Sequence, residues 1–240
     1  MKTNANSFDF RQTISKHSCI VMQSLLFDLD GTLLDHFICL ARCYEHVLGE
    51  LEQPIPSREE IRRAVGGSVE LTMANFVPSE IHTDACERWK KHLTSIVTEN
   101  AYLMPGALPL IQELKNQGRQ LAIFTNKVGE QSRVLCDHLE ISQYMDTVIG
   151  TDDTPYRKPH KEFSEHVLRA LRANPNNTAL IGDSPYDIQA AHAVNIPAYC
   201  VTTGTHTEAE LQAADADGIF PDLPALGKAL FGFELLTEIA

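Results

Sequence analysis

Two aspartates that are two residues apart follow a short apolar segment near the start of this 240-residue chain. The segment Ser24-Leu25-Leu26-Phe27 leads directly into Asp28-Leu29-Asp30-Gly31-Thr32. A short apolar run that ends in such a turn is typical of a buried parallel strand, and parallel α/β sheets bind ligands at the carboxyl ends of their strands. The chain turns as it leaves the strand, so both carboxylates can approach one reacting group. One can act as a nucleophile while the other moves a proton.

Three later segments carry polar side chains in a related setting. They are Phe124-Thr125-Asn126-Lys127, Lys158-Pro159-His160-Lys161 and Gly182-Asp183-Ser184-Pro185-Tyr186-Asp187. With the first segment they resemble, in order, the four motifs of the haloacid dehalogenase superfamily. Gly31-Thr32 and Gly182-Asp183-Ser184 are similar to its phosphoglycolate phosphatase-like branch. Four matches in one order are more specific than any single motif.

The resemblance implies a role for each motif residue. Asp28 would attack a phosphoryl group and carry it as a covalent intermediate. Asp30 would protonate the leaving oxygen and then remove a proton from the water that cleaves the intermediate. Thr125, Asn126 and Lys158 would bind the substrate phosphate, with Thr125 and Lys158 as fixed electrostatic catalysts.

The same resemblance implies a magnesium site. Mg²⁺ prefers a few carboxylate oxygens and bridges to substrate phosphate, which offsets the repulsion between an attacking carboxylate and a phosphate anion. Asp28 and Asp183 would hold the ion, together with the backbone carbonyl of Asp30. Asp187 lies one helical turn after Asp183 and would orient a metal-bound water or a ligand.

These motifs favour an Mg²⁺-dependent phosphatase that acts on a small phosphorylated metabolite, with phosphoglycolate as one candidate. The aspartate at position 30 disfavours dehalogenases and phosphonatases of the superfamily, which carry a different residue there. A sugar phosphomutase or a pyrophosphatase of the same superfamily is an alternative. A phospholigand-binding protein without catalysis is a third hypothesis, because a fold does not imply a function.

The apolar pattern predicts an α/β fold, a doubly wound Rossmann-like parallel sheet with an inserted all-helical domain. Short strands and helices alternate after Met104, which is typical of such a sheet. We assign residues 22–35 and 104–240 to this core and residues 1–21 to an N-terminal extension. Monomer and homodimer are both compatible with the sequence.

Residues 36–103 interrupt the strands with a helical pattern. Helices are expected over residues 37–50, 57–65, 68–76 and 79–98, with Ser57 and Ser79 as N-caps and Gly66-Gly67 as a break. This insertion resembles the C1 cap of the family, which closes over the site and selects the substrate. Arg63 lies in it and is our candidate for contact with the leaving group.

The net charge of −12 comes from 20 basic and 32 acidic residues and weighs against nucleic acid as a partner. Positive charge for a phosphorylated substrate would be local, from Mg²⁺, Lys158, Lys127 and Arg63. Six cysteines without a Cys-x-x-Cys pair favour reduced thiols and a cytoplasmic protein. No segment reaches the roughly 20 apolar residues of a membrane span, so no membrane partner is expected.

Overall fold

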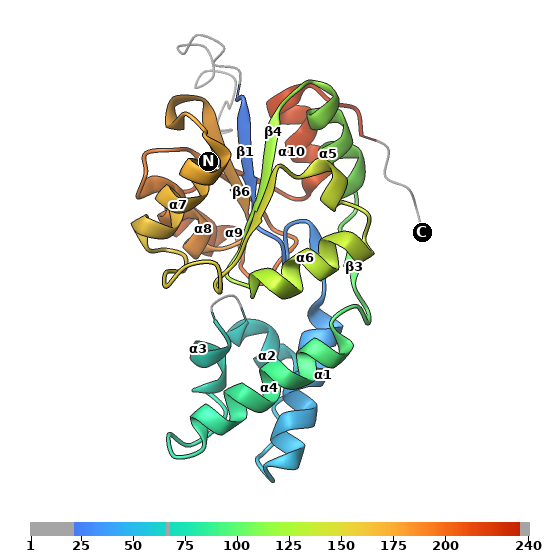
Figure 1. Cartoon of the computed structure of the whole chain (residues 1–240), viewed down its shortest axis with the longest axis vertical. Coiled ribbons are helices and arrows are strands. Elements are labelled where there is room, and N and C mark those ends of the chain that lie inside the picture. Colours follow the sequence, from blue (N-terminus) through green and yellow to red (C-terminus); the bar gives the residue numbers. More distant parts are fainter. Residues whose placement is uncertain (1–21, 66–67, 236–240) are drawn as a thin grey trace, which may run out of the picture.

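The computed structural model describes residues 22–65 and 68–235, and its centre is a six-stranded sheet (Figure 1). All of its strands are parallel, in the order β5-β4-β1-β6-β7-β8. The strands are β1 Ser24–Phe27, β4 Gln120–Phe124, β5 Thr147–Ile149, β6 Thr178–Gly182, β7 Ala198–Val201 and β8 Gly218–Phe220. The predicted N-terminal extension and the Gly66-Gly67 break lie outside the described residues.

Alternate residues of β1 face two separate hydrophobic cores, which is why the strand is apolar throughout. Leu25 and Phe27 belong to one core, and Leu26 belongs to the other. The first core includes side chains of α5 (Ala107–Asn116), α6 (Gly129–His138) and α10 (Leu223–Phe231). The second includes side chains of α7 (Lys161–Leu171), α8 (Pro185–His192) and α9 (Glu208–Ala213). Helices on both faces of a parallel sheet confirm the predicted doubly wound fold.

Four helices form a separate group beyond the carboxyl edge of the sheet (Figure 1). They are α1 Phe37–Glu50, α2 Arg58–Ala64, α3 Val69–Met73 and α4 His82–Ile96. The chain enters and leaves this group through two short antiparallel strands, β2 Leu34–Asp35 and β3 Tyr102–Leu103. The rings of Tyr44 in α1 and Trp89 in α4 have centroids 5.3 Å apart, so the group has an aromatic centre of its own. The domain division, with residues 36–103 as an inserted unit, stays a prediction.

The predicted start of α4 is wrong, whereas the predicted start of α2 is confirmed. Ser57 caps α2 through a reciprocal pair of bonds with Glu60, as its Ser-x-x-Glu spacing indicates. Ser79 does not cap a helix, because the chain makes a turn after Pro78 in which the Ile81 N–H donates to the Pro78 carbonyl. Helix α4 begins only at His82, and α3 ends at Met73 instead of the predicted residue 76.

No helix among residues 22–65 and 68–235 is long and apolar enough to span a membrane.

Candidate active site

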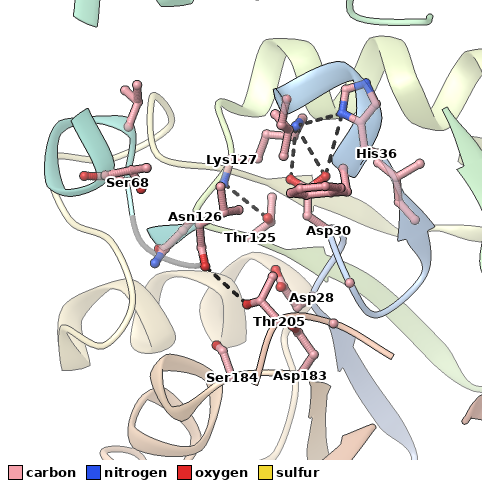
Figure 2. Close-up of a pocket in the computed structure, with 18 of the residues that line it drawn as sticks. Asp28, Asp30, His36, Ser68, Thr125, Asn126, Lys127, Asp183, Ser184 and Thr205 are labelled. Atoms are coloured by element: carbon pink, nitrogen blue, oxygen red, sulfur yellow. Dashed lines mark hydrogen bonds and ion pairs between the residues drawn. The ribbon is translucent and has the colours of Figure 1, made fainter. Parts of the chain in front are cut away.

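The first residues after three adjacent strands meet at the carboxyl edge of the sheet (Figure 2). Asp28 follows β1, Thr125 follows β4 and Asp183 follows β6. Since β1 lies between β4 and β6, these three side chains surround one point. This is the topology that the apolar runs predicted, with polar side chains from neighbouring parallel strands at one edge.

Lys158 bridges two buried carboxylates at this point. Its Nζ lies 2.8 Å from Asp28 Oδ1 and 2.6 Å from Asp187 Oδ1, and its side chain is almost fully buried. Burial alone would lower the pKa of Lys158, but the charges of Asp187 and Asp28 outweigh it and raise that pKa above its usual range. The lysine is therefore a fixed positive charge beside the Asp28 carboxylate.

Asp187 positions Lys158 through bonds at both ends of its carboxylate. Oδ1 accepts from Lys158, while Oδ2 accepts from the hydroxyl and the backbone N–H of Ser184 at 2.6 and 3.0 Å. Ser184 begins α8, so Asp187 completes a capping box and is itself fully buried. Both of its oxygens have partners, which favours a positioning role for Asp187 beside the other two aspartates.

Asp28, Asp183 and Asp187 form a carboxylate cluster that suits a divalent cation. One ligand atom from each residue lies within 4.8 Å of the other two. Burial raises the pKa of Asp28 to about 6, although Lys158 opposes this shift; Asp187 adds to it. Burial, with the charges of Asp28 and Asp187, also holds the pKa of Asp183 well above its usual range. Three crowded carboxylates beside one lysine carry excess negative charge, and hard oxygen donors of this kind suit Mg²⁺.

Two glycines leave room for Asp183. Gly31 has a φ of +83°, and a Cβ on it would lie 2.6 Å from Asp183 Oδ2. A Cβ on Gly204, after β7, would overlap the same carboxylate. A side chain at either position would displace Asp183, and an L-residue at position 31 would also be strained by its positive φ.

Thr125 and Asn126 have different partners. The Thr125 hydroxyl accepts from the Lys127 backbone N–H at 3.2 Å, which leaves its own O–H free to donate to a ligand. The Asn126 amide donates to the Lys158 carbonyl and accepts from the Lys158 N–H, at 3.2 and 2.8 Å. Both residues line the cavity described below, but Asn126 also fixes the backbone that carries Lys158.

Asp30 has two basic neighbours that could be expected only weakly from the sequence. Lys127 Nζ lies 3.0 Å from Asp30 Oδ2 and 3.3 Å from His36 Nδ1 (Figure 2). His36 is buried at the start of α1, and its Nδ1 lies 3.8 Å from Asp30 Oδ1. Their positions beside the first and second motifs were the only signals. The contact between Lys127 and Asp30 depends on the packing of the loops that follow β4 and β1.

Arg63 does not line the cavity, so the structure does not support the predicted substrate contact. Its side chain is 77% exposed and pairs with Glu59 one turn earlier in α2. The preceding residue, Arg62, lines the cavity instead, with its guanidinium 3.8 Å from the centroid of the Phe37 ring. Neighbouring residues on a helix point about 100° apart, so only one of the two arginines can face the sheet.

A cavity of about 340 Å³ lies between the strand ends and the helical group. Its floor contains every other predicted site residue except Asp187, which lies behind Lys158. Its remaining walls come from α1, α2, α3 and α4, from Gln131 of α6 and from loops of the core, including residues 203–205. The cavity therefore joins the carboxylate cluster to side chains that can select a ligand.

A family model described as "Haloacid dehalogenase-like hydrolase" matches residues 25–201. The chain belongs to this family. A phosphoglycolate phosphatase from Thiobacillus denitrificans is 28% identical over 210 residues, which cover 84% of this chain and 92% of that protein. A phosphoglycolate phosphatase from Salmonella typhi is 27% identical over 234 residues, with 86% and 93% covered.

Solved structures of the family share the fold. The haloacid dehalogenase-like hydrolase from Streptococcus pneumoniae has a TM-score of 0.80 and 25% identity, and the match covers 88% of this chain and all of that one. The resemblance drawn from the four motifs is thus confirmed. The roles of individual site residues stay predictions.

Proposed function

We propose that this enzyme hydrolyses phosphomonoesters of small metabolites through an aspartyl-phosphate on Asp28, with Mg²⁺ as cofactor. The observation that carries the proposal is the contact between Lys158 and Asp28 at the carboxyl edge of the sheet, opposite Thr125 and beside Asp183. A buried carboxylate with a fixed cation and a hydroxyl donor around it suits attack on a phosphoryl group. Relatives named phosphatase support this reaction class.

In the first half-reaction an Asp28 oxygen attacks phosphorus while the bond to the leaving oxygen breaks. Asp30 gives its proton to that leaving oxygen, and the rest of the substrate departs as an alcohol while the phosphoryl group stays on Asp28. Lys158 and the Thr125 hydroxyl stabilise the negative charge on the phosphoryl oxygens. In the second half-reaction Asp30 takes a proton from water, whose oxygen attacks phosphorus and releases phosphate and free Asp28.

The carboxylate cluster gives the proposal its cofactor. Asp28 and Asp183 would hold Mg²⁺ together with the backbone carbonyl of Asp30. Asp187 would orient a metal-bound water or a ligand. When bound, the ion supplies positive charge that offsets the repulsion between Asp28 and the substrate phosphate. Excess negative charge in the cluster supports this assignment.

Phosphate release from a panel of phosphorylated metabolites tests the proposed function. The panel contains 2-phosphoglycolate, which the names of the relatives suggest, with sugar phosphates, nucleotides and pyrophosphate. We expect release that needs Mg²⁺, stops with EDTA and is lost in Asp28→Asn. Phosphate migration within a sugar without release would instead identify a mutase. A folded protein that binds Mg²⁺ and turns over none of the panel would contradict the proposal.

A further inference from the structure

The cavity wall opposite the carboxylate cluster is apolar and aromatic. Leu40 and Tyr44 of α1 and Trp89 and Leu93 of α4 line it, and all four are almost fully buried. They belong to the hydrophobic core that also contains Leu25 and Phe27 of β1. They place an apolar surface where the alcohol part of a phosphomonoester would lie when its phosphate is at Asp28.

Two of the positive charges on the cavity wall have carboxylate partners. Lys90 Nζ lies 2.6 Å from Glu70 Oε1, and Lys127 is paired with Asp30. Arg62 stacks on the Phe37 ring and is in no ion pair among the described residues. A carboxylate on the alcohol part, such as that of 2-phosphoglycolate, would meet both the Arg62 guanidinium and the Glu70 carboxylate on this wall.

Four residues that line the cavity have a buried polar atom without a hydrogen-bond partner among the described residues. The atoms are Trp89 Nε1, Gln131 Oε1, Ser68 Oγ and His36 Nε2. Gln131 lies on α6, and its amide nitrogen donates to Thr94 Oγ1 across to α4 at 3.0 Å. These atoms are buried away from the cavity space, so they do not require hydrogen-bonding atoms on a ligand in it.

We propose that the enzyme prefers phosphomonoesters whose alcohol part carries an apolar ring. The inference rests on the proposed phosphatase activity and specifies the substrate class of the same site. A volume of about 340 Å³ lies in the range of pockets that hold ring-bearing small molecules. Trp89 and Tyr44 would contact the ring, and Leu40 would contact the chain that joins it to the phosphate.

A matched pair of substrates tests this inference without any mutation. Ethyl phosphate and 2-phenylethyl phosphate have similar leaving alcohols and differ by the ring. Burial of a ring against Tyr44 and Trp89 should raise kcat/KM about 10- to 100-fold for the phenyl compound. The gain should lie in KM more than in kcat, because the ring is bound equally in the ground state and the transition state.

Variants then test which side chains cause the preference for the phenyl ester. Trp89→Leu should reduce the ratio of the two kcat/KM values at least about fivefold. Trp89→Phe keeps a ring and should retain most of the preference. Tyr102→Leu removes an aromatic ring that is 62% exposed outside the cavity, and it should leave the ratio unaltered. Thermal denaturation shows which variants are folded.

The outcomes separate this inference from the proposed function. Equal kcat/KM for the two esters, or a higher value for 2-phosphoglycolate than for 2-phenylethyl phosphate, would overturn the substrate class and leave the phosphatase in place. Absence of phosphate release from every ester, with the protein folded and bound to Mg²⁺, would instead contradict the phosphatase. If Trp89→Leu does not fold, the wild-type comparison still decides the inference.

Discussion

The ammonium group of Lys127 lies 3.0 Å from the carboxylate of Asp30, although 97 positions separate them in the chain. Lys127 follows β4, and Asp30 lies between β1 and the strand that leads into the helical group. The lysine of this pair is shielded from solvent, because the Lys127 side chain is only 5% exposed. It fixes the proposed acid and base at the point where the helical group joins the sheet.

Loss of this contact should impair catalysis through Asp30. We expect Lys127→Met to lower kcat about tenfold, because the carboxylate would lose its defined orientation toward the leaving oxygen. The same change in an Asp30→Asn background should have little further effect, since the two residues act as one unit. Lys115→Met, which removes a surface ion pair with Asp146, is the matched control and should leave kcat unchanged. Additive losses from Lys127→Met and Asp30→Asn would contradict the coupling.

Lys158 should matter for stability as well as for activity. Lys158→Met would leave Asp28 and Asp187 buried without their cation, and removal of one partner from a buried ion pair costs about 3–5 kcal/mol. Urea denaturation with EDTA near neutral pH measures this loss. The surface variant Lys161→Met, which breaks an exposed pair with Glu165, should cost less than about 1 kcal/mol. Equal losses of unfolding free energy in the two variants would contradict the buried ion pairs of Lys158.

Stabilisation by Mg²⁺ should increase with pH. The pKa of Asp28 is raised to about 6 and that of Asp183 lies well above its usual range, so the folded protein binds protons more tightly than the unfolded chain. Without a cation, stability therefore falls as the pH rises through these folded-state pKa values. Mg²⁺ competes with the protons, so it should raise the Tm more at about pH 7.5 than at about pH 5. Calorimetry with MgCl₂ or EDTA measures both shifts.

Two outcomes bear on that metal site. Asp183→Asn should lose most of the Mg²⁺-dependent rise in Tm at the higher pH, because it removes a charged ligand from the cluster. A rise in Tm that is equal at both pH values, or larger at the lower one, would show that Mg²⁺ does not displace protons from these aspartates.

Arg63 should be dispensable for catalysis. Its side chain is exposed and pairs only with Glu59 among the described residues, so Arg63→Ala should change kcat/KM by less than about twofold. Steady-state kinetics on the best substrate of the panel checks this expectation. A tenfold loss would mean that the arginine reaches the substrate in a conformation that this structure does not contain.

The sheet and its catalytic edge could be predicted because they depend on local sequence. Apolar runs fixed the positions of β1, β4 and β6, and the residues that follow parallel strands necessarily lie at one edge. The sequence therefore predicts Asp28, Thr125 and Asp183 at one edge of the sheet, and the strand order in the structure makes them neighbours. The capping box of Ser57 is equally local, since both of its partners lie within one helical turn.

The helical group was harder to predict in detail because its contacts are between distant segments. A shift of one residue on α2 decides that Arg62, and not Arg63, faces the cavity. Serine is a residue type that often caps helices, but the chain forms a turn after Pro78, so α4 begins at His82 and not after Ser79. The pair of Lys127 with Asp30 depends on the packing of two loops, which no local pattern contains.

The most direct test of the central claim is to trap the phosphoryl group on Asp28. The Asp30→Asn variant lacks the base that activates water, so the intermediate should accumulate. A substrate with a good leaving group, p-nitrophenyl phosphate, does not need Asp30 as an acid in the first half-reaction. After acid quench, mass spectrometry should find one added phosphoryl group on the peptide that contains Asp28, and none in the Asp28→Asn, Asp30→Asn double variant. Phosphate release by the wild type without a trapped phosphoryl group, or with one on another residue, would contradict the account.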